Sequence, residues 1–210
     1  MNKEPLQIKV CGMRDPQNLE QVCGLAPEFI GYIFYAGSKR FIGKNPDPAL
    51  FSIPGPGIKK VGVFVNEDPG QVRKCIEFHQ LDVVQLHGNE DADYCRSLAP
   101  EGVQLIKVLD PFGSDPDSGV YEGVVDFFLF DSAGPGRGGT GEKFDWNVLE
   151  DKPLSAPFLL SGGIGPGDAT QLRLIAFPGM MGVDVNSRFE VTPGLKDVKA
   201  LKAFFNHIRK

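Results

Sequence analysis

Two side chains that can exchange protons each stand at the end of an apolar run. Cys11 ends LQIKVC, and Asp131 ends VDFFLFD. A free thiol has a pKa of about 8.5, so modest positive potential, such as that of Lys9 on the same strand face, would favour the thiolate. A carboxyl group at the tip of an apolar strand loses solvent, which raises its pKa and suits it as a general acid. The alternatives are a cysteine that fills core space and an aspartate that caps a loop.

Two turns are suited to hold an anion through backbone N–H groups. Gly162 and Gly163 follow an apolar run in LLSGGIGPGD, and Asn186 and Ser187 follow another in GVDVNSRFE. Glycine lets the main chain approach an oxyanion closely, and we expect Asn186 and Ser187 to cap a short extra helix. Glycines after a seventh strand and a helix start after an eighth strand together predict a phosphate site. For the glycine pair alone, a tight turn without a ligand is the alternative.

Two further polar residues follow apolar runs. Arg40 lies in the loop AGSKRF, where its guanidinium could pair with a substrate carboxylate in a bidentate manner. A solvated loop arginine is the alternative. His87 lies at the end of VVQLHG, where a polar role and a packing role are both open. Other polar residues that follow such runs are Tyr35, Asn66 and Asp110.

These residues can act together only if secondary-structure elements bring the ends of their apolar runs to one place. Eight apolar or β-branched runs begin near residues 6, 29, 58, 83, 104, 126, 157 and 181. Apolar residues at helical spacing lie between several of them, in 19–26, 72–79, 169–176 and 198–208. The alternation predicts a single (β/α)8 TIM barrel of the phosphate-binding type over residues 1–210, with active residues on the loops after the strands. An open doubly wound sheet is the alternative.

Composition restricts the class of protein. The chain has 210 residues, 41% of them hydrophobic, and a net charge of -5, which argues against nucleic-acid and anionic membrane partners. The four cysteines form no C-x-x-C pair, and neither zinc-ligand spacing nor a disulfide framework is evident. MNKEPLQIK lacks the apolar core of a signal peptide, and no run suggests a membrane span. We therefore expect a reduced, cytoplasmic protein without a metal.

Several of these motifs occur together in one known family. The chain resembles the phosphoribosylanthranilate isomerases of tryptophan biosynthesis from about Lys9 to Asp197. The matching segments, in order, are KVCGMRDPQN, GYIFYAGSKRFI, VGVFVNE, VQLHGNE, LFDS…GGTGEKFDW, LSGGIGP and GVDVNSRFE…PGLKD. KVCG, QLHG and DVNS are weak signals singly, but their combination is highly specific.

The resemblance implies a (β/α)8 barrel that uses no cofactor and catalyses the Amadori rearrangement of N-(5-phosphoribosyl)anthranilate. By position, Cys11 is then the general base, Asp131 the general acid and Arg40 the contact of the anthranilate carboxylate. The glycine turn and the DVNS segment, which includes Asp184, then bind the phosphate. The expected partner is this phosphorylated small molecule, and the expected assembly is a monomer or homodimer.

Local departures and competing enzymes limit the match. AGSKRF lacks the proline that often precedes the arginine, and Arg188 and Phe189 stand where many members have small residues. The related histidine-pathway isomerase would be expected to have aspartate in place of Cys11, and an indole-glycerol-phosphate synthase would need catalytic lysines. A non-catalytic phosphometabolite-binding barrel is the alternative outside enzymes. The glycine-rich segment after Asp131 could close over a substrate or form a long exposed turn.

Overall fold

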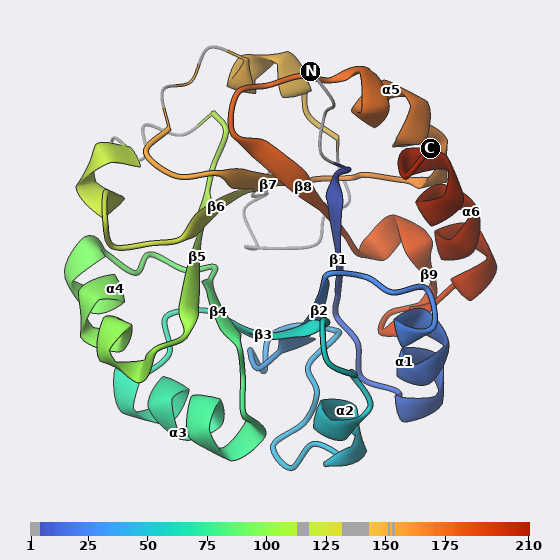
Figure 1. Cartoon of the computed structure of the whole chain (residues 1–210). Helices are drawn as coiled ribbons and strands as arrows, with labels where there is room; N and C mark the ends of the chain where they lie inside the picture. Colours follow the sequence, from blue (N-terminus) through green and yellow to red (C-terminus); the bar gives the residue numbers. More distant parts are fainter. Residues whose placement is uncertain (1–4, 113–117, 132–142, 151, 153) are drawn as a thin grey trace.

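Eight parallel strands pair in chain order, and the last pairs with the first, so that the sheet closes into a barrel. This computed structural model describes residues 5–112, 118–131, 143–150, 152 and 154–210. Figure 1 shows the strands in a central ring with the helices outside it. The predicted fold class is therefore confirmed, and the open doubly wound sheet is wrong.

The strands coincide with the eight apolar runs. Several of them, such as β2 and β6, are nearly continuous in hydrophobic residues because parallel strands are covered on both faces. Their bounds are β1 Gln7–Cys11, β2 Phe29–Ile33, β3 Lys59–Phe64, β4 Val83–Leu86, β5 Gln104–Leu109, β6 Phe127–Phe130, β7 Phe158–Leu160 and β8 Met180–Val185.

Four of the described helices begin where an aspartate side chain accepts a free N–H group of the first turn. The side chains of Asp15, Asp68, Asp91 and Asp197 each accept from the backbone N–H three residues further on. The described helices are α1 Pro16–Cys23, α2 Ala49–Ser52, α3 Pro69–His79, α4 Ala92–Leu98, α5 Ala169–Leu174 and α6 Val198–Ile208. None of them is long and apolar enough to cross a membrane.

The chain between β8 and α6 contains an element that the apolar pattern did not predict. Glu190–Thr192 (β9) pairs antiparallel with Leu195–Lys196 (β10) in a small separate sheet. The pattern missed it because both strands are too short to show an alternation. This hairpin brings Glu190 and Lys196 to the rim of the barrel, where both take part in the site described below.

Side chains alternate between two cores along each strand. One core fills the inside of the barrel and includes Cys11, Val63 and Ile106, whereas the other packs between the strands and the helices. Residues on the inner face at the carboxyl ends of the strands therefore meet at one opening.

The barrel closes where β8 approaches β1. Lys9 pairs in register with Asp184, and Lys9 Nζ donates to Asp184 Oδ1 at 2.9 Å inside the barrel. Two residues earlier on β8, a Cβ at Gly182 would overlap the backbone carbonyl of Gln7. The close approach of these two strands therefore requires a residue without a side chain at position 182.

We expect Gly182→Ala to lower the free energy of unfolding by about 1–3 kcal/mol, because the added methyl group forces β8 away from β1. Urea denaturation measures the change. Gly167→Ala is the matched control, since a Cβ at Gly167 meets no atom within 4 Å. Equal stability of the two variants would contradict a close seam.

Candidate active site

A cavity of about 390 Å³ opens at the carboxyl ends of the strands. Every residue predicted to act in catalysis or binding lines it, although these residues come from six different strands or their following loops. They are Cys11, Arg40, His87, Asp131, Gly162, Gly163, Asp184, Asn186 and Ser187. Asn66 and Asp110, which also follow strands, do not line it. The predicted closing loop at 132–142 lies outside the described residues.

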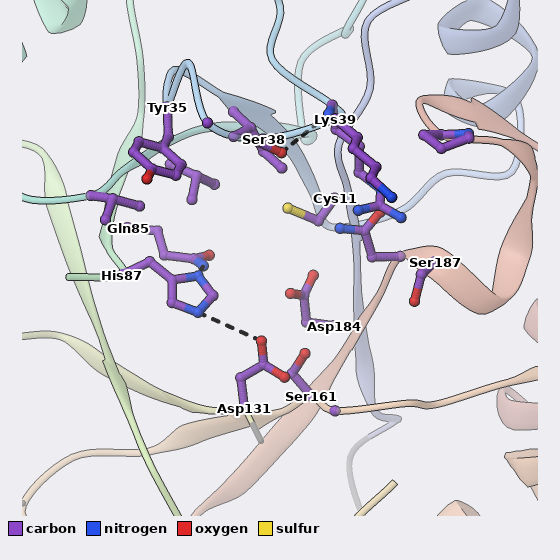
Figure 2. A pocket seen from close by; sticks show the side chains of 18 of the residues that line it. Cys11, Tyr35, Ser38, Lys39, Gln85, His87, Asp131, Ser161, Asp184 and Ser187 are labelled. Carbon is purple, nitrogen blue, oxygen red and sulfur yellow. Dashed lines mark hydrogen bonds and ion pairs between the residues drawn. The ribbon is translucent and has the colours of Figure 1, made fainter. Parts of the chain in front are cut away.

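The thiol of Cys11 faces the cavity although most of the residue is covered. Cys11 is 4% exposed and packs in the inner core, and Figure 2 shows its sulfur pointing into the open space between Ser38 and Asp184. A Cβ at Gly31 on the neighbouring strand would lie 2.8 Å from this sulfur. A glycine at position 31 therefore leaves the thiol the room that its orientation needs.

Burial and nearby charged groups act in opposite directions on the pKa of the thiol. Burial raises the pKa of the Cys11 thiol above its ordinary value, while the positive charges of Lys9 and Lys196 act in the opposite direction. Burial has the larger effect, so Lys9 offsets only part of the rise in the pKa of the thiol. Burial by itself would lower the pKa of Lys9, but the carboxylate of Asp184 holds it above its ordinary value.

Asp184 is engaged by Lys9. Its side chain is 7% exposed and accepts the hydrogen bond from Lys9. Asp184 lines the cavity with Asn186 and Ser187, and its assignment to phosphate binding stays a prediction. The residue also keeps the Lys9 ammonium charged beneath the thiol.

Asp131 and His87 meet on the opposite side of the cavity. Asp131 Oδ2 lies 3.5 Å from His87 Nε2, and both side chains are about one-seventh exposed. Gln85, two residues before His87 on β4, places its Nε2 3.4 Å from His87 Nδ1 (Figure 2). The imidazole thus lies between an amide and the carboxyl group proposed as an acid.

A buried ion pair holds the loop that carries His87. Glu90 accepts hydrogen bonds from the backbone N–H groups of Asn66 and Gly88, and from Lys107 Nζ at 2.9 Å. Lys107 also donates to the carbonyl oxygen of Gly88 at 2.8 Å. Sequence reasoning missed both charged residues. A lysine inside the apolar run LIKVL was the available signal, because a buried lysine needs a partner.

The glycine turn after β7 has the backbone conformation that its sequence indicated. Gly162 and Gly163 have φ angles of +85° and +66°, which only glycine adopts readily. A short 3₁₀ helix over Ser187–Phe189 follows β8, as expected. Asn186 occupies the N-cap position of this helix as expected, but its side chain makes no cap hydrogen bond, because Asn186 Oδ1 accepts from Lys196 Nζ at 2.6 Å.

Arg40 is held at the cavity rim by Glu190. Its Nε donates to both carboxylate oxygens at 2.9 and 3.0 Å, and its Nη2 donates to one at 2.7 Å. Lys196 donates to the same carboxylate at 2.7 Å. Burial alone would raise the pKa of Glu190, but the hydrogen bonds from Arg40 and Lys196 hold it below the ordinary value of 4.5. Arg40 is therefore an oriented cation rather than a solvated loop arginine.

Phe189 and Arg188, the two residues that depart from the expected family pattern, have different environments. Phe189 is buried and packs edge-to-face on Phe204 of α6, so it anchors the turn after β8. Arg188 is exposed and its side chain lies beside Gly165 at the end of the glycine turn. Among the described residues, no three histidine, cysteine or carboxylate side chains gather as a metal site would require.

Known proteins show which family this chain belongs to. Residues 8–207 match the family model of N-(5'phosphoribosyl)anthranilate (PRA) isomerase. The chain belongs to this isomerase family. It is 44% identical over 205 residues to N-(5'-phosphoribosyl)anthranilate isomerase of Parabacteroides distasonis, covering 96% of this chain and 92% of that protein. It is thus an enzyme of tryptophan biosynthesis that isomerises phosphoribosylanthranilate.

Solved isomerases have the same barrel. The Thermotoga maritima phosphoribosyl anthranilate isomerase is 30% identical, with a TM-score of 0.80 over 97% of this chain and 98% of that one. A second solved isomerase, 27% identical with a TM-score of 0.77 over 97% of this chain and 98% of that one, is in complex with reduced 1-(o-carboxyphenylamino)-1-deoxyribulose 5-phosphate.

We expect Glu190→Gln to lower the free energy of unfolding at pH 7 by about 1–3 kcal/mol, because it leaves the buried Lys196 and the partly buried Arg40 with a weaker acceptor. The pKa of Glu190 is below 4.5 in the folded state, so the wild-type advantage is fully present above pH 4.5 and shrinks as the pH falls through the folded pKa. Urea denaturation at pH 7 and at lower pH measures both values.

The control for this pH dependence is Glu77→Gln, an exposed residue on α3. It is expected to change stability little at either pH. A Glu190→Gln deficit that stays constant as the pH falls below 4.5 would show that the charge of Glu190 is unimportant.

Proposed function

We propose that Cys11 and Asp131 are the general base and general acid of the Amadori rearrangement of N-(5-phosphoribosyl)anthranilate. The observation that carries this proposal is their placement in one cavity, on β1 and directly after β6, beside a glycine turn. A base and an acid that face a common space can act on different atoms of one sugar.

The chemistry requires a proton donor first and a proton acceptor second. Protonation of the furanose ring oxygen by Asp131 breaks the bond between this oxygen and C1′, which leaves an iminium ion. The positive charge of the iminium acidifies the neighbouring C2′–H, and the thiolate of Cys11 removes this proton. The electron pair of the C–H bond forms the double bond between C1′ and C2′. The resulting enolamine then tautomerises to the ketone, without a cofactor.

The raised pKa of the Cys11 thiol fits a base that acts only with substrate present. A buried thiolate of high pKa is a strong base, and Lys9 supplies a nearby positive charge that stabilises it. The iminium ion adds a second positive charge at the moment the base is needed. The thiol therefore loses its proton to solvent water before it acts, and the resulting thiolate is stabilised most when the substrate ring has opened.

The substrate carries an anionic group at each end, and different parts of the cavity rim can bind these two groups. We assign the phosphate to the backbone of Gly162 and Gly163 together with the segment Asn186–Ser187, whose residues line the same cavity. The anthranilate carboxylate is assigned to Arg40, whose Nη1 makes none of the contacts with Glu190. His87 is assigned to substrate binding beside Asp131. The phosphate and carboxylate of the ligand in the solved relative support this division.

Cys11→Ala and Asp131→Asn are each expected to reduce kcat by about 100- to 10,000-fold, because each removes one proton-transfer group. The labile substrate is generated in situ, and loss of anthranilate-type fluorescence measures turnover. The Kd of inorganic phosphate should remain at the wild-type value, since neither variant alters the glycine turn. Cys75→Ala, on α3 outside the cavity, is the matched control.

Unchanged turnover in either active-site variant would refute the role of that residue. A wild-type protein that binds phosphate and never turns over the substrate would favour the non-catalytic binding barrel. The organisation as one domain, the assembly as a monomer or homodimer, the absence of nucleic-acid partners and the cytoplasmic location stay predictions.

A further inference from the structure

The side chain of Gln85 is buried at the floor of the cavity with half of its amide group unpaired. Gln85 is 1% exposed and lines the cavity from β4. Its Nε2 lies 3.4 Å from His87 Nδ1, but its Oε1 has no hydrogen-bond partner among the residues that the structure describes. Figure 2 shows this side chain directed into the space between Tyr35, Cys11 and Asp131.

The neighbouring strands offer nothing that could pair with this oxygen. Gln85 is in register with Val63 on β3 and with Ile106 on β5, and both are buried apolar residues of the inner core. A buried amide oxygen without a partner costs free energy, and most such groups in proteins are paired. An apolar side chain of similar size would pack here without this cost. The amide is therefore explained if its oxygen accepts a hydrogen bond from a ligand bound in the cavity.

The chemistry of the substrate limits what Gln85 can contact. Oε1 only accepts hydrogen bonds, whereas the phosphate and the carboxylate of the substrate carry few or no hydrogens near neutral pH. The amine N–H of anthranilate stands next to its ortho carboxylate, which accepts it internally. The ribosyl hydroxyl groups are the remaining donors, and they lie between the two anionic ends.

We propose that Gln85 is a substrate-binding residue whose Oε1 accepts a hydrogen bond from a ribosyl hydroxyl group of the bound substrate. The proposal rests on the function proposed above and assigns it a further residue. The hydrogen bond places the sugar at the depth of Cys11, because Gln85 reaches the cavity from inside the barrel rather than from a rim loop.

The other end of the same amide acts on His87. Because Gln85 Nε2 donates to His87 Nδ1, a neutral imidazole carries its hydrogen on Nε2, the atom that lies 3.5 Å from Asp131. A hydroxyl group bound at Oε1 holds the amide in this orientation. Substrate binding at Gln85 thus also keeps the hydrogen of His87 on Nε2, where it faces Asp131.

Gln85→Met tests the proposal, because methionine keeps the volume and removes both polar atoms. We expect the Kd of reduced 1-(o-carboxyphenylamino)-1-deoxyribulose 5-phosphate, measured by calorimetry, to rise by about tenfold, the effect of one lost hydrogen bond. The Kd of inorganic phosphate should not change, and kcat/KM should fall at least as much as the affinity. Gln7→Met is the matched control, on the same face of β1 as Cys11 but at the other end of the strand.

Stability separates a role in binding from a role in folding. If Gln85 serves the substrate, Gln85→Met unfolds at the same or higher urea concentration than the wild type, because a buried unpaired oxygen is removed. Lower stability together with unchanged ligand affinity would overturn the proposal, as would an unchanged Kd for the analogue alone. A wild type that binds the analogue without turnover would refute the proposed function, whereas the binding comparison would still decide the role of Gln85.

Discussion

The positions of the thiol and of the turn after β8 depend on the seam at which β8 closes onto β1. Lys9 and Asp184 stand next to each other in the strand register and form an ion pair inside the barrel. Neither charge is stable there alone, because removal of one leaves the other buried without compensation. Cys11 lies two residues beyond Lys9, and Asn186 lies two residues beyond Asp184. The pair therefore sets the distance between the thiol and the turn after β8.

Buried charges also explain how an acidic chain can hold a substrate with two anionic ends. The net charge of -5 describes the whole surface, whereas the cavity rim holds Arg40 and Lys196 against one carboxylate, that of Glu190. Two cations that share one anion leave a local positive field. Because this field is confined to the rim, it can favour an anionic small molecule without attracting nucleic acid or membrane surfaces.

The sequence predicted the fold well because its signals are local. Apolar runs and apolar residues at helical spacing act within a few residues, so the strands and most of the helices could be placed from them. The β9–β10 hairpin and the partner of Asn186 could not be placed. The two strands are too short to show an alternation, and the hydrogen bond from Lys196 to Asn186 forms only when the hairpin folds back.

The sequence alone determined which types of residue stand at the strand ends, including Cys11, Asp131 and the two glycines. It also determined the class of chemistry that they could perform. Tertiary structure decided which of them face one another and how their charges interact. In the folded barrel, burial raises the pKa of the thiol by more than the nearby lysine lowers it. Tertiary structure also turned Asp184 toward Lys9 and left Gln85 facing the cavity. The physical reason is that solvent exclusion and pairing depend on distances across the barrel, which the order of residues does not contain.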